Sequence, residues 1–144
     1  MNAPASTQQV LLRSLSLPPI GTLWPEVGGI FVGIARGQNG AVDHVLILSE
    51  VDPGKLKWKA ALEWAKSLKV NALEDFDLPT RSEQALLFAN VPELFERDWW
   101  YWSNTPHASD SSYAWCQSFD DGYQVFNHEP NAFRARAVRR LPLQ

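Results

Sequence analysis

The spacing of hydrophobic positions begins with the pattern of an antiparallel hairpin. β-Branched and aromatic residues predict a strand over residues 28–36, and a second apolar run predicts its partner over residues 41–49. The Asn39-Gly40 pair between them is typical of a tight hairpin turn, because both residues tolerate a positive φ. The sequence therefore predicts two paired strands near the start of the chain.

Two segments with helical periodicity follow. The first covers residues 56–69, and its apolar residues recur every three or four positions. They are Trp58, Ala61, Leu62, Ala65 and Leu68. The second helix is expected to begin after Thr80, since Glu83 three residues later completes a capping box, and to end near Asn90. Its expected core positions are Ala85, Leu86, Phe88 and Ala89.

After Asp98 the pattern changes to short aromatic strands separated by polar turns. Strands are expected over residues 99–103, 114–119, 123–126 and 133–141, with polar loops over residues 104–112 and 127–131. The resulting order, two strands, two helices and four strands, is typical of an α+β domain with helices packed on an antiparallel sheet. It differs from the alternating order of a nucleotide-binding sheet.

Residues 1–24 are predicted to form an N-terminal tail or strap, and residues 25–144 one folded domain. The tail is polar at first, and Pro18-Pro19 prevents a helix from continuing through it. We expect its leucines to lie across the domain as a strap rather than to form a partner-binding helix. These leucines are Leu11, Leu12, Leu15 and Leu17.

Composition excludes several classes of protein. The 144 residues are 45% hydrophobic and 20% charged, which argues against disorder. A net charge of -3 argues against a general nucleic-acid binder. The single cysteine, Cys116, permits neither an internal disulfide nor a cysteine-based zinc site.

The chain carries no pattern of membrane insertion or export. No run reaches the roughly 18 apolar residues of a membrane-spanning helix. The first residues lack the basic and apolar regions of a signal peptide. We therefore expect a cytoplasmic protein, located in the host cytoplasm or in a virion if a phage encodes it.

Four motifs, in order along the chain, resemble those of the DUF1566 (Lcl C-terminal) family. Residues 78–83 resemble its "RLPT-x-x-E" helix start, and residues 101–105 its "YWSST" strand. Residues 114–123 are similar to its "FxDG" hairpin, and residues 133–139 to its closing "RxRAVR" strand. The resemblance covers about residues 28–141, well beyond a lone motif.

The resemblance implies a C-type lectin-like fold. That fold is also used by sulfatase-modifying enzymes, phage receptor-binding proteins and proteins diversified by retroelements. It serves sugar binding, protein binding and one oxidase chemistry, so the fold does not select a function. The oxidase relatives hold copper with two cysteines, whereas this chain has only Cys116.

The tripeptide Glu129-Pro130-Asn131 matches the letters of a calcium-binding motif in mannose-type lectins. Calcium needs six to eight oxygen ligands, but the next segment offers Arg134 and Arg136 instead of carboxylates. We expect a turn here, built by Asn127, Pro130 and Asn131, and no metal or other cofactor.

A cluster of arginines near the C-terminus raises the question of nucleic-acid binding. It consists of Arg134, Arg136, Arg139 and Arg140. We expect these cations to form cross-strand salt bridges with Asp120, Asp121 and Glu129 instead of contacts with phosphates.

Histidines could act as catalytic bases, but a positioned nucleophile is hard to find. His107 and His128 are expected to converge at one end of the late sheet, near Asp110 and Glu129, while His44 lies elsewhere. The candidate nucleophiles are loop serines and Cys116, and strand alternation predicts that Cys116 is buried. We therefore do not expect an enzyme.

The expected function is recognition of a protein partner through loops at the sheet end, as a host-factor inhibitor or receptor contact if a phage encodes the chain. The loops are residues 104–113, 120–123 and 127–131, flanked by an outward aromatic pair. A carbohydrate-binding lectin-like module remains the alternative, and a homodimer through the aromatic strand or the strap stays open. The predicted contact residues are Trp100, Trp102, His107, Asp110, Tyr113, Asp121, Tyr123, His128, Glu129 and Asn131.

Overall fold

The structure of the chain is a computed structural model that describes residues 16–143. Within this range it has two α-helices, α2 (Trp58–Ser67) and α3 (Arg81–Asn90), and two 3-10 helices, η1 (Pro25–Val27) and η2 (Pro92–Leu94). The strands are β1 (Leu23–Trp24), β2 (Gly29–Ala35), β3 (His44–Leu48), β4 (Lys55–Leu56), β5 (Phe76–Asp77), β6 (Trp100–Pro106), β7 (Tyr113–Ser118), β8 (Gln124–His128), β9 (Phe133–Arg134) and β10 (Val138–Pro142).

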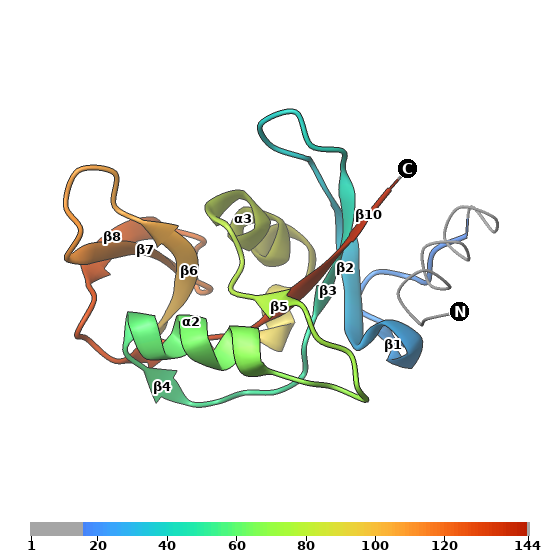
Figure 1. Ribbon diagram of the computed structural model, residues 1–144, viewed down its shortest axis with the longest axis horizontal. Helices are drawn as coiled ribbons and strands as arrows, with labels where there is room; N and C mark the ends of the chain where they lie inside the picture. The colour runs from blue at the N-terminus through green and yellow to red at the C-terminus, as the bar shows by residue number, and fades with distance from the viewer. Residues whose placement is uncertain (1–15, 144) are drawn as a thin grey trace.

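The strands form two five-stranded sheets. The first has the order β1-β2-β3-β10-β5 and the second the order β4-β9-β6-β7-β8. Neighbouring strands are antiparallel except for β6 and β9. Figure 1 shows α3 between the two sheets and α2 alongside the second. The predicted α+β class is confirmed, and the C-type lectin-like assignment stays an expectation that rests on the resemblance.

The first sheet buries both of its faces by strand alternation. One set of side chains packs with α3 and η2, and it includes Ile30, Val32, Leu46, Leu48 and Val138. The other set packs with Leu17 and Trp24 of the N-terminal segment, and it includes Phe31, Val45, Ile47 and Leu141. The near-continuous apolar runs at residues 30–32 and 45–48 follow from this two-sided burial.

Strand β6 lies in the middle of the second sheet and is covered on both faces. Tyr101 packs with Phe95 and Phe119 on the side of α3, whereas Trp102 packs with Trp58 and neighbouring residues on the side of α2. The expectation that alternation turns one aromatic pair outward is therefore wrong. Both faces of the strand meet a helix, so neither Tyr101 nor Trp102 reaches solvent.

The predicted last strand, residues 133–141, is two strands in different sheets. β9 pairs with β4 and β6, and β10 pairs with β3 and β5. Residues 135–137 cross between the sheets, and this crossing is buried. The buried Arg136 guanidinium has hydrogen-bond partners at this crossing, because it donates to the carbonyls of Ser49 and Leu94.

Helix α3 has the predicted capping box but buries a different face. The Thr80 hydroxyl accepts from the Glu83 backbone, and the Glu83 carboxylate accepts from the Thr80 backbone. The buried side chains are Glu83, Gln84 and Leu87 rather than the expected apolar set, of which Ala85 and Ala89 are exposed and Leu86 and Phe88 half-buried. Polar residues can face inward because the second sheet supplies partners, such as the Tyr101 carbonyl for Gln84 Nε2.

The first hairpin and the first helix are shorter than predicted. Strand β2 ends at Ala35 and β3 begins at His44, so a longer loop over residues 36–43 surrounds the expected positive-φ pair Asn39 and Gly40. Helix α2 begins at Trp58 because Lys55 and Leu56 instead pair with β9.

The N-terminal strap is described only from residue 16, so Leu11, Leu12 and Leu15 lie outside the described residues. Strand β1 pairs with β2, and Leu17 packs on the first sheet. The first sheet therefore begins before the predicted boundary at residue 25. Among the described residues, no helix has the length and apolar character needed to cross a membrane.

Candidate binding site

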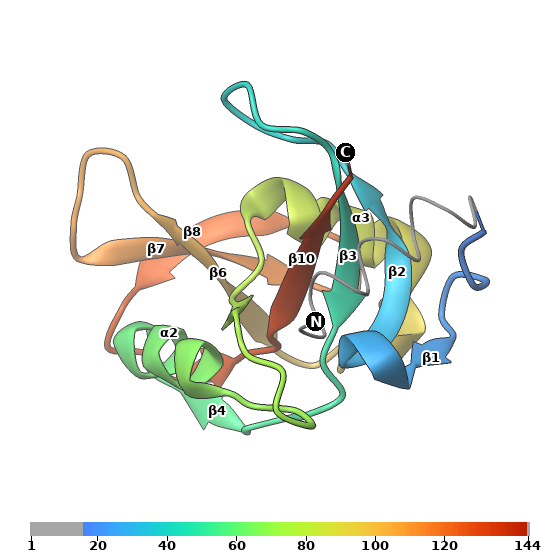
Figure 2. The ribbon, with the colours of Figure 1, turned by 45° about the vertical axis from the view of Figure 1, so that its right-hand side comes forward.

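One end of the β7–β8 hairpin gathers most of the predicted contact residues. Tyr113 lies directly opposite His128 in the strand register, and the His107 ring lies 4.4 Å from the ring of Phe126. The predicted convergence of His107 and His128 at one end of the late sheet is therefore confirmed. The loop between β6 and β7 projects away from the helices, as its orange trace shows in Figures 1 and 2, whereas the turn after β8 adjoins the start of α2.

Five rings in mutual contact form what we call the aromatic face. Alternation along β7 and β8 places Tyr113, Trp115, Phe126 and His128 on the same side, and His107 joins them from the loop. Ring centroids of Tyr113 and Phe126 are 5.7 Å apart, and those of Trp115 and Phe126 are 5.4 Å apart. Phe126 remains 42% exposed. His128 is also exposed, whereas His107, Tyr113 and Trp115 are half-buried, so part of the aromatic face is open to solvent.

The loop from His107 to Tyr113 is held in shape by its own hydrogen bonds. The backbone N–H of His107 donates to the Tyr113 carbonyl at 2.8 Å, and His107 Nδ1 accepts from the backbone of Asp110 at 3.2 Å. The Asp110 carboxylate accepts from the hydroxyl and the backbone of Ser112. The Ser112 hydroxyl is the main reason that the pKa of Asp110 is lowered. A loop ordered in this way loses less entropy when it binds.

A cavity of about 420 Å³ adjoins this loop. The loop contributes Ser111 and Ser112, the turn after β8 contributes His128, Glu129 and Pro130, and the start of α2 contributes Lys57 and Lys59. The turn is built as predicted, since Asn131 Nδ2 donates to Asn127 Oδ1 at 3.0 Å and the Asn131 backbone donates to the His128 carbonyl. Glu129 is only 8% exposed, and its backbone carbonyl accepts from the N–H of Trp58.

Four predicted contact residues lie elsewhere. Asp121 and Tyr123 form the turn at the opposite end of the β7–β8 hairpin, about 17 Å along the strand from His128. Trp100 is half-buried and contacts Tyr123, with ring centroids 6.4 Å apart. Trp102 is completely buried, and its Nε1 donates to the Leu56 carbonyl. The predicted single surface is therefore two surfaces, and Trp102 belongs to neither.

The sequence-based list missed Trp115, Phe126 and Arg81. The Arg81 guanidinium lies 3.5 Å from the Trp115 ring centroid, as a cation–π contact. Alternation over residues 113–117 and 124–128 places Trp115 and Phe126 on the face of Tyr113 and His128, so that signal was present. Arg81 has no comparable local signal, because it is 34 positions before Trp115 and meets it only through the packing of α3.

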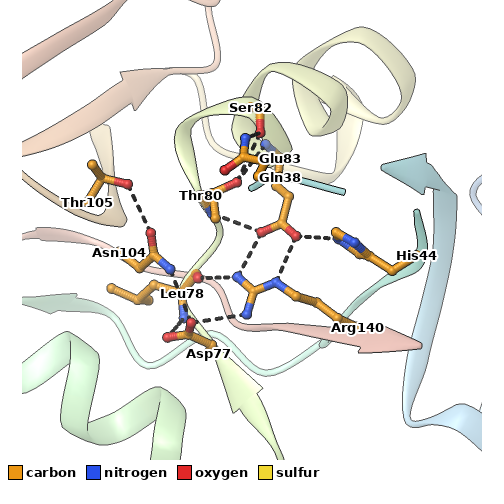
Figure 3. A network of polar contacts seen from close by, with 10 residues as sticks. All are labelled: Gln38, His44, Asp77, Leu78, Thr80, Ser82, Glu83, Asn104, Thr105 and Arg140. Atoms are coloured by element: carbon orange, nitrogen blue, oxygen red, sulfur yellow. Dashed lines mark hydrogen bonds and ion pairs between the residues drawn. The ribbon is translucent and has the colours of Figure 1, made fainter. Parts of the chain in front are cut away.

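A second polar cluster is buried where α3, β10 and β3 meet, and Figure 3 shows it from close by. Arg140 donates to both carboxylate oxygens of Glu83, at 2.7 and 2.8 Å, and His44 Nε2 donates to the same carboxylate at 2.6 Å. Burial alone would raise the pKa of Glu83, but the hydrogen bonds and charge of Arg140, with smaller contributions from Thr80 and His44, lower it. Glu83 is therefore a buried carboxylate held ionised.

Asp77 extends this buried network to the second sheet. It accepts from Arg140 Nη1 and from Asn104 Nδ2, each at 3.1 Å, and Asn104 Oδ1 accepts from the Thr105 hydroxyl (Figure 3). The network joins the helix start at residues 78–83, the strand at residues 101–105 and the closing strand. Residues 78–83 and 101–105, two of the motifs found in the sequence, thus meet inside the molecule together with Arg140, which directly follows the closing motif, and they help to hold the two sheets together.

The arginines are paired, but not with the predicted acids. Arg140 pairs with Glu83 and Asp77, and Arg139 pairs with Asp75 at 2.7 Å. Arg134 lies 3.9 Å from Asp52 and 3.8 Å from Asp98, and Arg136 donates to backbone carbonyls. The predicted partners Asp120, Asp121 and Glu129 are wrong because residues 133–141 do not continue the sheet beside them.

A comparison with known families agrees with the motif resemblance over most of the chain. A family model described as the Lcl C-terminal domain matches residues 30–139. The chain belongs to the Lcl C-terminal domain family. The match includes α3, the β7–β8 hairpin and the first residues of β10, so the aromatic face lies within the family domain, as does the polar cluster except for Arg140. The comparison with curated proteins returns no match.

Two features of the described residues bear on the candidate chemistry: the environment of the Cys116 thiol and the arrangement of possible metal ligands. Cys116 is buried as predicted, and burial raises the pKa of its thiol to about 12. Such a thiol stays protonated and unreactive near neutral pH. Within residues 16–143, no group of three or more His, Cys, Asp or Glu side chains is arranged to hold a metal ion.

Proposed function

We propose that this Lcl C-terminal domain is a non-enzymatic recognition module that binds a protein partner through the aromatic face and the loops beside it. The observation that carries the proposal is the group of five contacting rings on β7, β8 and the His107 loop, of which Phe126 and His128 are exposed. Aromatic side chains are enriched at the centres of protein interfaces because they bury a large area at low entropic cost.

The shape of the aromatic face favours a protein over a flat sugar ring. Tyr113 and Trp115 each meet Phe126 nearly at right angles, with interplanar angles of 86° and 84°. The Trp115 ring is stacked against Arg81. The rings therefore present a ridged surface, which suits apolar side chains inserted between them.

The charges around the aromatic face indicate the chemistry of the partner. Arg81 lies on one side, and Lys57 and Lys59 lie at the cavity beside His128. Although the whole chain has a net charge of -3, these cations are joined on this surface only by the exposed Asp110 and the nearly buried Glu129 among the acids described above. A partner segment that combines apolar and acidic side chains fits this surface best.

Carbohydrate binding is the second candidate, and the cavity of about 420 Å³ favours it. Its lining combines two serine hydroxyls, two lysines and the Glu129 region, next to an aromatic side chain, His128. Hydroxyl and charged groups of this kind can hydrogen-bond a polyol. This candidate predicts retention on immobilised glycans rather than capture of a protein.

The test uses the tagged full chain as bait in a bacterial lysate, with two matched variants. His107→Ala with Tyr113→Ser removes two rings of the aromatic face, while Ile34→Ala with Val42→Ser removes two exposed apolar side chains from the other sheet and its loop. We expect a protein that the native and control baits retain and the aromatic-face variant loses. The purified partner should then bind the native chain at least ~10-fold more tightly than the variant by calorimetry.

Two results would contradict the proposal. One is a set of captured proteins that is the same for all three baits. The other is a purified partner whose affinity does not change with the aromatic-face variant. Retention on glycans that depends on Ser111 and Lys59, with no captured protein, would favour the second candidate.

A further inference from the structure

Strand β8 is an unprotected edge of the second sheet. It pairs with β7 on one side, and within residues 16–143 no strand pairs with its other side. Its five residues, Gln124 to His128, include neither proline nor a permanently charged side chain. Edge strands usually carry such residues because they prevent pairing with another chain. The composition of β8 therefore leaves the edge open to a further strand.

The backbone hydrogen bonds of the hairpin fix which groups of β8 point outward. Glu129 N–H donates to the carbonyl of Ser112, and Ser118 N–H donates to the carbonyl of Tyr123. In an antiparallel pair, bonded and non-bonded pairs alternate. The N–H and C=O groups of Gln124, Phe126 and His128 therefore point away from β7, toward the open edge.

We propose that β8 pairs with β8 of a second copy of this chain, antiparallel and centred on Phe126. Each Phe126 then donates to and accepts from the Phe126 of the other copy. His128 N–H, which donates to Asn127 Oδ1 at 3.2 Å in the single molecule, meets the Gln124 carbonyl on both sides. Gln124 N–H meets the His128 carbonyl, which also accepts from Asn131. The second sheets of two molecules become one continuous sheet.

A second copy fits this edge because the arrangement of its outward backbone groups is symmetric about Phe126. A two-fold axis at that residue brings every outward donor opposite an outward acceptor, as a self-complementary contact requires. The register places Gln124 of one copy opposite His128 of the other, and none of the five residues of β8 is permanently charged. The two strands therefore meet without repulsion between like permanent charges.

The proposed dimer differs from a dimer formed through the aromatic strand β6. Strand β6 has a neighbour on both sides, β9 and β7, so it offers no edge. Pairing at β8 lies in the plane of the sheet and leaves the aromatic face open. It places two aromatic faces next to each other, so a partner with two copies of its binding segment gains avidity.

The molar mass of the full chain tests this inference directly. Light scattering after size-exclusion chromatography, over a roughly hundredfold range of concentration, should give twice 16.3 kDa at the upper end. Phe126→Lys and Phe126→Glu each place two like charges opposite each other at the two-fold axis, and each variant alone should be monomeric. Circular dichroism and thermal unfolding show whether each variant is folded.

Mixing the two variants supplies the decisive control. The lysine introduced in one chain would face the glutamate introduced in the other only if residue 126 lies on the axis, so the mixture should regain the dimer mass. Ile34→Lys adds the same charge to an exposed position of β2 and should remain dimeric. A wild-type chain that stays monomeric overturns the inference, as does a Phe126→Lys dimer or a folded mixture that stays monomeric. If the wild-type chain is monomeric but the aromatic-face variant still fails to bind the captured partner, the inference is overturned and the proposed function stands.

Discussion

At the residue scale, the carboxylate of Glu83 shows how a buried charge can be kept in this fold. Only 2% of the residue is exposed, yet both oxygens accept hydrogen bonds from Arg140, His44 or the Thr80 backbone. An ionised group loses its hydration on burial, and several donors are needed to replace it. Glu83 therefore serves two purposes, since it caps α3 and joins that helix to β10 and β3.

We expect Glu83→Gln to lower the free energy of unfolding by about 3 kcal/mol, because it leaves the Arg140 guanidinium without its main counter-charge inside the protein. Chemical denaturation at neutral pH measures the change. Glu93→Gln makes the same substitution at a residue of η2 with no buried partner and should change stability by less than about 0.5 kcal/mol. Equal effects of the two variants would contradict the structural role of Glu83.

The lowered pKa of Glu83 also predicts how stability depends on pH. The unfolded carboxyl has its ordinary pKa of 4.5, and the folded one titrates below it. Its contribution is therefore complete above pH 4.5 and is lost as the pH falls through the folded pKa. Denaturation curves across the acidic range should show a steeper loss of stability for the native chain than for Glu83→Gln. Parallel curves would show that Glu83 does not carry this dependence.

The sequence reveals only the local half of this network. The spacing of Thr80 and Glu83 predicts the capping box, since the motif lies within one turn of helix. His44 and Arg140 lie 39 and 57 positions away from Glu83, and no periodicity connects them to it. Their meeting depends on the sheet order, which a single sequence does not specify.

At the scale of elements, the turn between β7 and β8 depends on a glycine for two reasons. Gly122 has a φ of 80°, and a Cβ there would lie 2.7 Å from Phe88 Cδ2 of α3. Gly40 in the β2–β3 loop has a similar φ of 84°, but a Cβ there would meet nothing within 4 Å. The two glycines share the conformational requirement and differ in their surroundings.

This difference predicts the ranking of two alanine variants. Gly40→Ala should cost about 1 kcal/mol of stability, the usual penalty of a left-handed conformation for a residue with a Cβ. Gly122→Ala should cost about 1–3 kcal/mol more, because the new methyl group forces the Phe88 ring to move. Thermal and chemical unfolding of both variants measure the difference, and equal costs would mean that the Phe88 contact is not tight.

Periodicity predicts the type of most elements but not where the chain changes sheets. Residues 133–141 read as one strand because Phe133, Ala135, Ala137 and Leu141 alternate with arginines. The buried crossing at residues 135–137 keeps this alternation although it pairs with neither sheet. Arg136 is buried at the crossing, where it donates to the backbone carbonyls of Ser49 and Leu94. In the sequence, the same arginine looks like a solvent-facing residue of a continuous strand.

At the scale of the whole molecule, the β7–β8 hairpin separates loops that the sequence groups together. The polar loops at residues 104–113, 120–123 and 127–131 all follow strands of one sheet, so they suggest one surface. Because a hairpin reverses direction, its turn lies at one end and its two strand ends at the other. The candidate site therefore contains His107, Tyr113 and His128 but neither Asp121 nor Tyr123.

Calcium should leave the stability of the whole domain unchanged. The Asn131 side chain already donates to Asn127, and the following β9 contributes Arg134 rather than a carboxylate. We expect the same melting temperature with millimolar calcium and with a chelator, measured by scanning calorimetry on the full chain. A melting temperature raised by calcium would show a site at Glu129-Pro130-Asn131 and would restore the calcium-dependent lectin hypothesis.

The place of β10 in the first sheet also has a consequence for the growing chain. Residues 138–142 lie between β3 and β5, although every other strand of that sheet is translated earlier, and Figure 2 shows β10 beside β3. During synthesis, β3 therefore has an open edge that includes Val45, Ile47 and the groups later bonded to β10. The first sheet cannot close until residue 142 has left the ribosome, so a nascent chain interrupted before Val138 remains exposed to chaperones and proteases.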